Sequence, residues 1–164
     1  MWTDERGSEV LDRPECRRLL AVGAKERLHG HLAVADGSVP FVLPLDYSMH
    51  DSDIIIQIGE GLFSGVVDRL VAFQVDGRLG HQGLQGVEDV CDWSVLAQGL
   101  ATEVDSGSIG HDGPRPRVAD PGHRMVRIRT DVLTGRRLHP PEPRELAASV
   151  RQPKKKSRGM HPAR

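Results

Sequence analysis

The chain of 164 residues suits one domain of ordinary size, and its six aromatic side chains leave a core built mainly from Val, Leu and Ile. No stretch approaches the run of about 18 apolar residues that a membrane-spanning helix needs. The charged start "MWTDERGSEVLDRPE" lacks the apolar segment of a signal peptide. A cytoplasmic location is therefore expected, with Cys16 and Cys91 as free thiols.

Charge is distributed unevenly behind a formal net charge of −1. Residues 151–164 carry six Lys and Arg and no acid, so the other 150 residues hold 16 basic and 23 acidic side chains. Such a tail is typical of a disordered, solubilising terminus, with a nucleic-acid or membrane role as the alternative. The acidic body argues against nucleic acid as the main partner. We expect a flexible N-terminus (1–9), one domain (10–140) and a Pro-rich, then basic tail (141–164).

The first elements in chain order are a helix and a β-hairpin. Residues 14–23 begin with Pro14 and end at Gly23, as a short helix does. The segment 27–35 reads as a strand and "DGS" as a turn. The next strand alternates apolar side chains from Val39 to Tyr47, which completes the hairpin.

Pro40 and Pro44 are four residues apart in this second strand. Their missing N–H groups point to the same lateral side, so the hydrogen-bond ladder on that side is broken. Two interpretations stay open. The strand is an ordinary edge strand protected against aggregation, or it borders a gap in a barrel wall where a flat ligand lies against free backbone.

Later segments add a crossover helix at 61–70 and a glycine-rich loop at 77–91. Four further strands are expected, at 54–58, 70–76, 93–104 and 124–133. Gly99 inside the fifth strand indicates a bulge or a close approach of another backbone. The prediction is a mainly β protein, a small closed or split barrel of six strands with a short N-terminal helix and one crossover helix.

The junction "IGEGL" between the third strand and the crossover helix has the outline of a phosphate site, because free N–H groups at a helix start attract anions. No Lys or Arg stands in this junction, and Glu60 adds a negative charge. His29 and His31 share a strand face but have no third ligand at a metal-binding spacing, so no metal site is predicted. No residue is recognisable as a catalytic acid, base or nucleophile.

Six segments follow one another in an order shared with a known family. They are "ECRRLL", "GHLAVADGSVPFVLPLDY", "IIIQIGEGL", "LVAFQVD", "WSVLAQGLA" and "VRIRTDVLTGRRL", over residues 10–138. Together they resemble the pyridoxamine 5'-phosphate oxidase-like split barrels, in particular the actinobacterial flavin/deazaflavin oxidoreductase branch. The resemblance implies a split barrel of the FMN-binding type, a homodimer, and a flavin in the groove between two barrels. It favours placing the strand with Pro40 and Pro44 along that groove.

The resemblance also implies which residues surround the cofactor. Pro44, Leu45 and Asp46 would line the flavin ring through the backbone of the interrupted strand. The residues expected around the ribityl phosphate end are Gln57, Ile58, Gly61 and Leu62.

Two more segments match parts of the family that lie near the cofactor. Trp93 and Ser94 match the family's "WSV", where Trp93 would pack at the ring or fill the core. Arg136 or Arg137 of "TGRR", or an arginine of the partner subunit, would supply charge to the phosphate.

The implied function is that of a flavin-dependent oxidoreductase, in which FMN carries the hydride or electron transfer and a small-molecule substrate is not specified. Members that hold FMN typically carry Arg-Thr where this chain has Gln57-Ile58, and often a Lys where it has Leu62-Phe63. Without these three residues FMN binding is expected to be weakened on the order of a hundredfold or more. Deazaflavin and haem are alternative cofactors. The competing function is a dimeric binding protein without enzymatic activity. Gln57→Arg combined with Ile58→Thr is predicted to tighten FMN binding at least tenfold.

Overall fold

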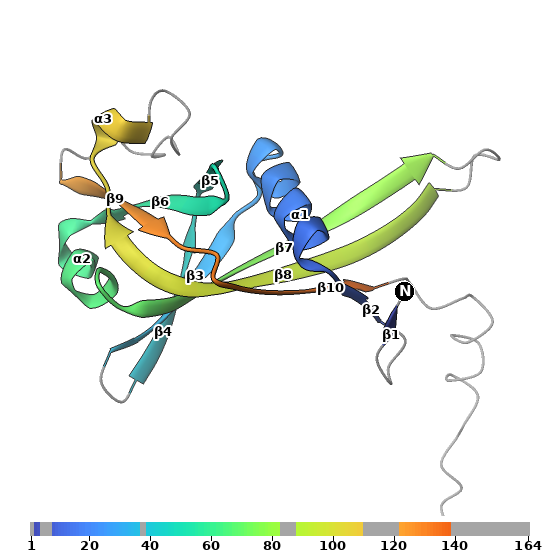
Figure 1. Ribbon diagram of the computed structural model, residues 1–164, viewed down its shortest axis with the longest axis horizontal. Helices are drawn as coiled ribbons and strands as arrows, with labels where there is room; N and C mark the ends of the chain where they lie inside the picture. The colour runs from blue at the N-terminus through green and yellow to red at the C-terminus, as the bar shows by residue number, and fades with distance from the viewer. Residues whose placement is uncertain (1, 4–7, 37–38, 83–87, 110–121, 139–164) are drawn as a thin grey trace, which may run out of the picture.

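The computed structural model describes residues 2–3, 8–36, 39–82, 88–109 and 122–138 (Figure 1). These residues form a mainly β protein with three helices, α1 (Arg13–Lys25), α2 (Glu60–Val66) and α3 (Ser106–Ile109). The strands are β1 (Trp2–Thr3), β2 (Glu9–Leu11), β3 (Gly30–Asp36), β4 (Val39–Leu45), β5 (Tyr47–His50), β6 (Asp53–Gly59), β7 (Leu70–Gln82), β8 (Glu88–Glu103), β9 (His123–Ile128) and β10 (Val132–Leu138).

The prediction of six strands is wrong, because the described residues contain ten. Two predicted strands are each divided into two: Asp46 separates β4 from β5, and residues 129–131 separate β9 from β10. The short strands β1 and β2 were not expected, and β1 lies within the N-terminal nine residues. In both cases the alternation of side chains continues across the break. Sequence periodicity therefore predicted one strand where the structure has two.

One curled antiparallel sheet contains all these strands. Its main path runs β1-β2-β10-β8-β7-β3-β4, while β5, β6 and β9 continue from the C-terminal part of β8. Because β8 spans 16 residues, it pairs along its length with β7 and, on its other side, first with β10 and then with β9. The chain passes directly from β4 to β5 through Asp46, and this connection joins the end of the main path to the strands β5, β6 and β9.

The core fills the inner face of the curl, and α1 packs against it (Figure 1). Asp12 caps α1 by accepting a 2.8 Å hydrogen bond from the Glu15 amide, and Pro14 occupies the first turn. Cys16 is fully buried and free, and burial raises the pKa of its thiol. The Tyr47 hydroxyl donates a 2.7 Å hydrogen bond to the Leu20 carbonyl oxygen, which joins α1 to the sheet.

Gly77 allows a strand to pack closely against the core. The sequence had indicated a glycine-rich loop over residues 77–91. The described part of that segment belongs instead to the long antiparallel pair β7–β8, visible as the extended ribbon in Figure 1. A Cβ atom at Gly77 would come within 2.4 Å of the Trp93 ring and 2.8 Å of Leu28. The glycine therefore lets the strand pass over a fully buried indole.

The Gly99 prediction is confirmed, because a Cβ atom there would collide with the carbonyl group of Arg129. The Arg129 amide donates a 3.0 Å hydrogen bond to the Leu100 carbonyl oxygen, so this approach fixes the turn between β9 and β10. Among the described helices, none is long and apolar enough to cross a membrane.

Candidate functional site

Strand β4 lies at the end of the main sheet path and pairs only with β3 among the described strands. Its register with β3 runs unbroken through Pro40, opposite Ala35, and Pro44, opposite His31. The missing N–H groups of both prolines therefore lie on the free edge, away from β3. β4 is an edge strand, and the backbone next to Pro44 is open to contacts from outside the sheet.

The chain bends at Asp46, directly after this edge. Pro44 is exposed on the outer face of the sheet, whereas the Leu45 side chain packs against the core from its half-buried position. Nδ1 of His29 lies 2.7 Å from Oδ1 of Asp46, within hydrogen-bond distance. This pair holds the bend and places an imidazole at its outer side.

At the junction of β6 and α2, the side chains expected around the phosphate point to different faces of the sheet. Ile58 is 1% exposed and belongs to the core, so only its backbone faces a ligand. Gln57 lies on the opposite, outer face of β6. Leu62 is half-buried in α2, and a Cβ atom at Gly61 would meet no atom within 4 Å, so space surrounds this turn.

Arg124 of β9 lies against the same junction, opposite Ile58 in the β6–β9 register. Its guanidinium lies 3.7 Å from the centre of the Phe63 ring. It donates to Oε1 of Glu103 at 2.6 Å and to Oε1 of Glu60 at 3.2 Å, and the hydrogen bond to Glu103 raises its pKa. The junction thus has a cation beside it, already engaged by two carboxylates.

A second group of polar side chains occupies the outer face of β5, β6 and β9. Ser48 and Arg127 both pair with Ile55, from opposite sides of β6, and Gln57 is two residues further along. Ser48 Oγ, Gln57 Oε1 and Arg127 Nε are shielded from solvent and have no hydrogen-bond partner among the described residues. Ile55, between Ser48 and Arg127, is fully buried and packs with Ile109 and Met125, so side chains cover this face.

The "WSV" and "TGRR" residues lie elsewhere. Trp93 is 2% exposed and fills the core between Gly23 and Gly77, whereas Ser94 is half-buried on the outer face. The guanidinium of Arg137 pairs with Glu9 at 2.9 Å and with Glu15 at 2.5 Å. Binding a phosphate would require it to break these ion pairs. It lies on β10, well away from α2 along the long axis of the molecule (Figure 1).

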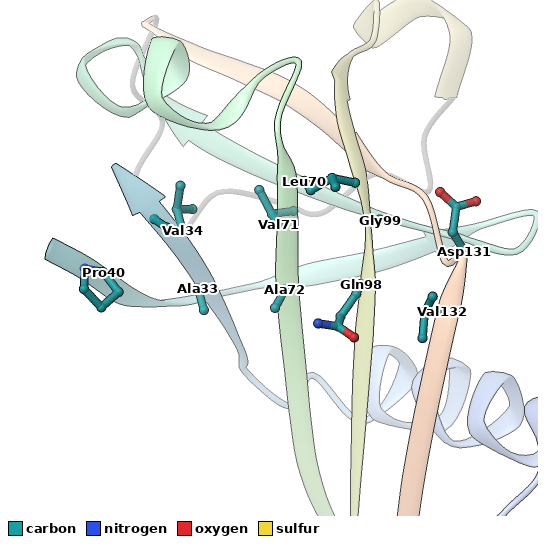
Figure 2. Close-up of a pocket in the computed structure, with 11 residues that line it drawn as sticks. Ala33, Val34, Pro40, Leu70, Val71, Ala72, Gln98, Gly99, Asp131 and Val132 are labelled. Atoms are coloured by element: carbon teal, nitrogen blue, oxygen red, sulfur yellow. The ribbon is translucent and has the colours of Figure 1, made fainter. Parts of the chain in front are cut away.

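An open groove of about 460 Å³ lies on the outer face of the main sheet. Figure 2 shows Ala33, Ala72, Gln98 and Val132 in one row across β3, β7, β8 and β10. None of the ten residues expected around the cofactor lines it, and its only charged lining residue is Asp131. The groove is thus apolar and offers no cation to a phosphate.

Sequence reasoning missed Arg124 and Arg127 as neighbours of the phosphate turn. Their alternation along "RMVRIR" indicates opposite faces of one strand, but only the β6–β9 register brings that strand beside Gln57 and Ile58. Within the described residues no three His, Cys, Asp or Glu side chains are grouped to hold a metal ion.

Comparison with known proteins places this arrangement in a family. Residues 12–137 match the sequence model of the pyridoxamine 5'-phosphate oxidase family. No curated protein sequence matches the chain significantly. An FAD-binding protein from Mycobacterium smegmatis has 23% identity and a TM-score of 0.64, with 81% of this chain and 100% of that chain covered.

Two further solved structures share the fold. An FAD-binding protein from Mesorhizobium loti has 21% identity and a TM-score of 0.58, with 79% of this chain and 97% of that chain covered. An FAD- and haem-binding protein from Mycobacterium smegmatis has 12% identity and a TM-score of 0.55, with 87% and 79% covered. Because the family match spans most of the sequence, and the fold agrees with it, the chain belongs to the pyridoxamine 5'-phosphate oxidase family.

Proposed function

We propose that this protein is a flavin-dependent oxidoreductase built as a homodimer of split barrels of the FMN-binding type, located in the cytoplasm. Family membership and the flavin-binding proteins of the same fold support a flavin cofactor. FMN is the form that the family resemblance favours, with deazaflavin and haem as alternatives.

The observation that carries the proposal is the free edge at Pro44. A planar ring needs a flat, open stretch of backbone, and β4 offers one along its unpaired edge at Pro44, next to the bend at Asp46. In this arrangement Pro44, Leu45 and Asp46 contact the ring mainly through the backbone. Trp93 supports the sheet from the core side, because its side chain is buried beneath it.

The outer face of the main sheet fits a second copy of the chain. Val42, Leu70 and Val132 are 59%, 79% and 51% exposed on this face, around the apolar groove. Helix α1 packs on the other face, so no described helix covers these side chains. Burial of such a patch is favourable at about 25 cal/mol per Å², which supports pairing of two sheets here.

A bound flavin supplies hydride or electron transfer, and the protein's own residues bind and orient it. The His29–Asp46 pair would hold the bend beside the ring, because Nδ1 of His29 lies 2.7 Å from Oδ1 of Asp46. The backbone at Pro44 and Leu45 would contact a bound ring and orient it. The apolar face buried in the dimer would keep water from that ring.

A second candidate function is a dimeric binding protein without enzymatic activity. It is favoured by the junction at β6 and α2, where Ile58 faces the core and Glu60 is a 68% exposed carboxylate that would repel a phosphate. On this hypothesis the fold and the dimer are kept and the ligand is flat and uncharged, or absent.

A visible absorbance spectrum of the freshly purified protein distinguishes the two candidate functions. The spectrum is measured again after excess FMN has been added and the protein has been desalted. The proposal expects a flavin band that desalting does not remove, because the edge and the outer face both contact the ring. A deazaflavin or haem band would replace FMN by that cofactor. A colourless protein that releases all added FMN would favour the binding protein without enzymatic activity.

A further inference from the structure

The groove on the outer face of the main sheet has a floor of small side chains between larger ones. Strand pairing places Val42, Ala33, Ala72, Gln98 and Val132 in one row across the sheet, and Figure 2 shows the last four. The valines at the two ends are 59% and 51% exposed, whereas an alanine side chain adds a single carbon above the sheet. The volume of about 460 Å³ is in the range of small-molecule sites.

The chemistry of the lining favours an uncharged ligand. No Lys or Arg is among the described residues that line the groove, and the one carboxylate, Asp131, has its Oδ1 3.0 Å from Nη2 of Arg129. The other polar side chain is that of Gln98, which is exposed and makes no hydrogen bond within the described part of the chain. An amide both donates and accepts, so Gln98 suits a neutral carbonyl or amide group on an otherwise apolar ligand.

The groove lies next to the edge at which the flavin ring is proposed to bind. Pro44 is directly opposite His31, and His31 is two residues from Ala33 on the same strand. Residues two apart in a strand share a face and lie about 7 Å from each other. A molecule that rests on the alanine floor can therefore reach a ring at Pro44, with the exposed His31 side chain between the two positions.

The proposed dimer would close this groove without filling it. A second copy that packs on the outer face meets the most exposed side chains first, which are Leu70 at 79% and the two valines. The floor at Ala33 and Ala72 lies lower, so a cavity would remain between the two copies. Such a cavity would keep water away from a ligand beside the ring.

We propose that the groove over Ala33 and Ala72 is the substrate pocket of the flavin reaction, and that its substrate is an uncharged, mainly apolar molecule with one polar group that hydrogen-bonds to Gln98. This assignment rests on the proposed flavin function. It separates the two ligands by chemistry, since a phosphorylated or carboxylate substrate would find no cation among the described lining residues.

The test titrates two fluorescent probes into the full-length protein in the presence of saturating FMN. N-phenyl-1-naphthylamine is uncharged, and 8-anilinonaphthalene-1-sulfonate adds a sulfonate to the same ring system. The wild type is expected to bind the uncharged probe at least tenfold more tightly, because the sulfonate would lose water without gaining a cation. Ala72→Phe places an aromatic ring on the floor and should weaken binding of the uncharged probe at least tenfold.

Thr134→Phe is the matched control, since it adds the same side chain at an exposed position of β10 that does not line the groove. It should leave the affinity for the uncharged probe unchanged. Binding of this probe should also shift the flavin absorbance band in the wild type and in Thr134→Phe, but not in Ala72→Phe. All three proteins should bind FMN alike, because the ring contacts the edge at Pro44.

Equal affinities of the wild type for the two probes, or an affinity that Ala72→Phe does not change, would overturn the assignment while the flavin function stands. A bound probe that leaves the flavin band unshifted would overturn the role of the groove as a substrate pocket. A dimeric wild type that binds neither probe would show that the second copy fills the groove. Loss of FMN with intact probe binding would instead overturn the proposed function. If Ala72→Phe does not fold, Ala33→Leu repeats the test on the neighbouring strand.

Discussion

The guanidinium of Arg124 lies over the ring of Phe63, 3.7 Å from its centre, and so connects β9 to α2. The same guanidinium pairs with Glu60 at the start of α2 and with Glu103 at the end of β8. A seven-residue helix has few hydrogen bonds of its own, so contacts of this kind decide whether it stays docked. The helix beside the proposed cofactor is thus held by its own core residues, Val66 and Phe63, and by one arginine from a strand far away in sequence.

Arg124→Gln is expected to speed amide hydrogen exchange in α2 with little change in the overall melting temperature, because the lost contacts are local and partly exposed. Hydrogen exchange followed by mass spectrometry measures this directly. Arg78→Gln removes the comparable exposed pair with Asp92 on the β7–β8 ribbon and should leave α2 unaffected. Unchanged exchange in Arg124→Gln would show that packing of Phe63 and Val66 against the core is enough to hold the helix.

Repair of the phosphate contacts by Gln57→Arg is expected to tighten FMN binding at least tenfold, since it restores the arginine that FMN-holding family members carry at this position. The single substitution is preferable to the pair with Ile58→Thr. Ile58 is in the core, and a buried threonine hydroxyl without a partner costs about 1–3 kcal/mol of stability. Ala21→Arg, at an exposed position of α1, controls for the added charge. Equal affinities of Gln57→Arg and wild type in calorimetry would mean that the phosphate lies elsewhere.

The dimer proposed for the outer sheet face is tested by Val42→Asp. A carboxylate buried in an apolar interface is costly to desolvate, so this variant is expected to be monomeric in analytical ultracentrifugation. Val42 is 59% exposed, so the monomer itself should remain folded. Val10→Asp, at a 41% exposed position on β2, introduces the same change outside the groove and should stay dimeric. A dimeric Val42→Asp protein would require a different interface.

Gly77→Ala is expected to destabilise the protein by about 1–3 kcal/mol, because the added methyl group would overlap the Trp93 ring. The free energy of unfolding in urea gives the value. Gly80→Ala, three residues later on the same strand, is the control, since a Cβ atom there meets nothing within 4 Å. Equal stabilities for the two variants would mean that Trp93 moves at little cost.

The protonation of Glu15 should contribute to the pH dependence of the protein's stability. Hydrogen bonds from Arg18, and then from Arg137, hold its pKa below the ordinary value of 4.5. A depressed pKa contributes stability above the unfolded-state value, and this contribution is lost as the pH falls through the folded-state value. The difference in melting temperature between wild type and Glu15→Gln should therefore shrink between about pH 6 and pH 3. Arg18→Gln should flatten part of that slope, and a constant difference would contradict the assignment.

Local sequence patterns determined much of the fold. The alternation in β3 and β4, the "DGS" turn and the two prolines predict a hairpin with a free edge, and β4 is an edge strand. The order of six segments identified the family. Gly99 indicated a close backbone approach, which Arg129 makes. Each of these signals depends on residues close together in sequence, where propensity and turn chemistry act directly.

Tertiary structure decided what the sequence left open around the candidate site. Ile58 faces the core and Gln57 faces outward because the curl of the sheet sets which side of β6 is inside. Arg137 pairs with two carboxylates, and Arg124 reaches Glu60, only through strand pairings between residues far apart in the chain. Register and curvature come from packing of the whole core, and no local window of sequence contains that information.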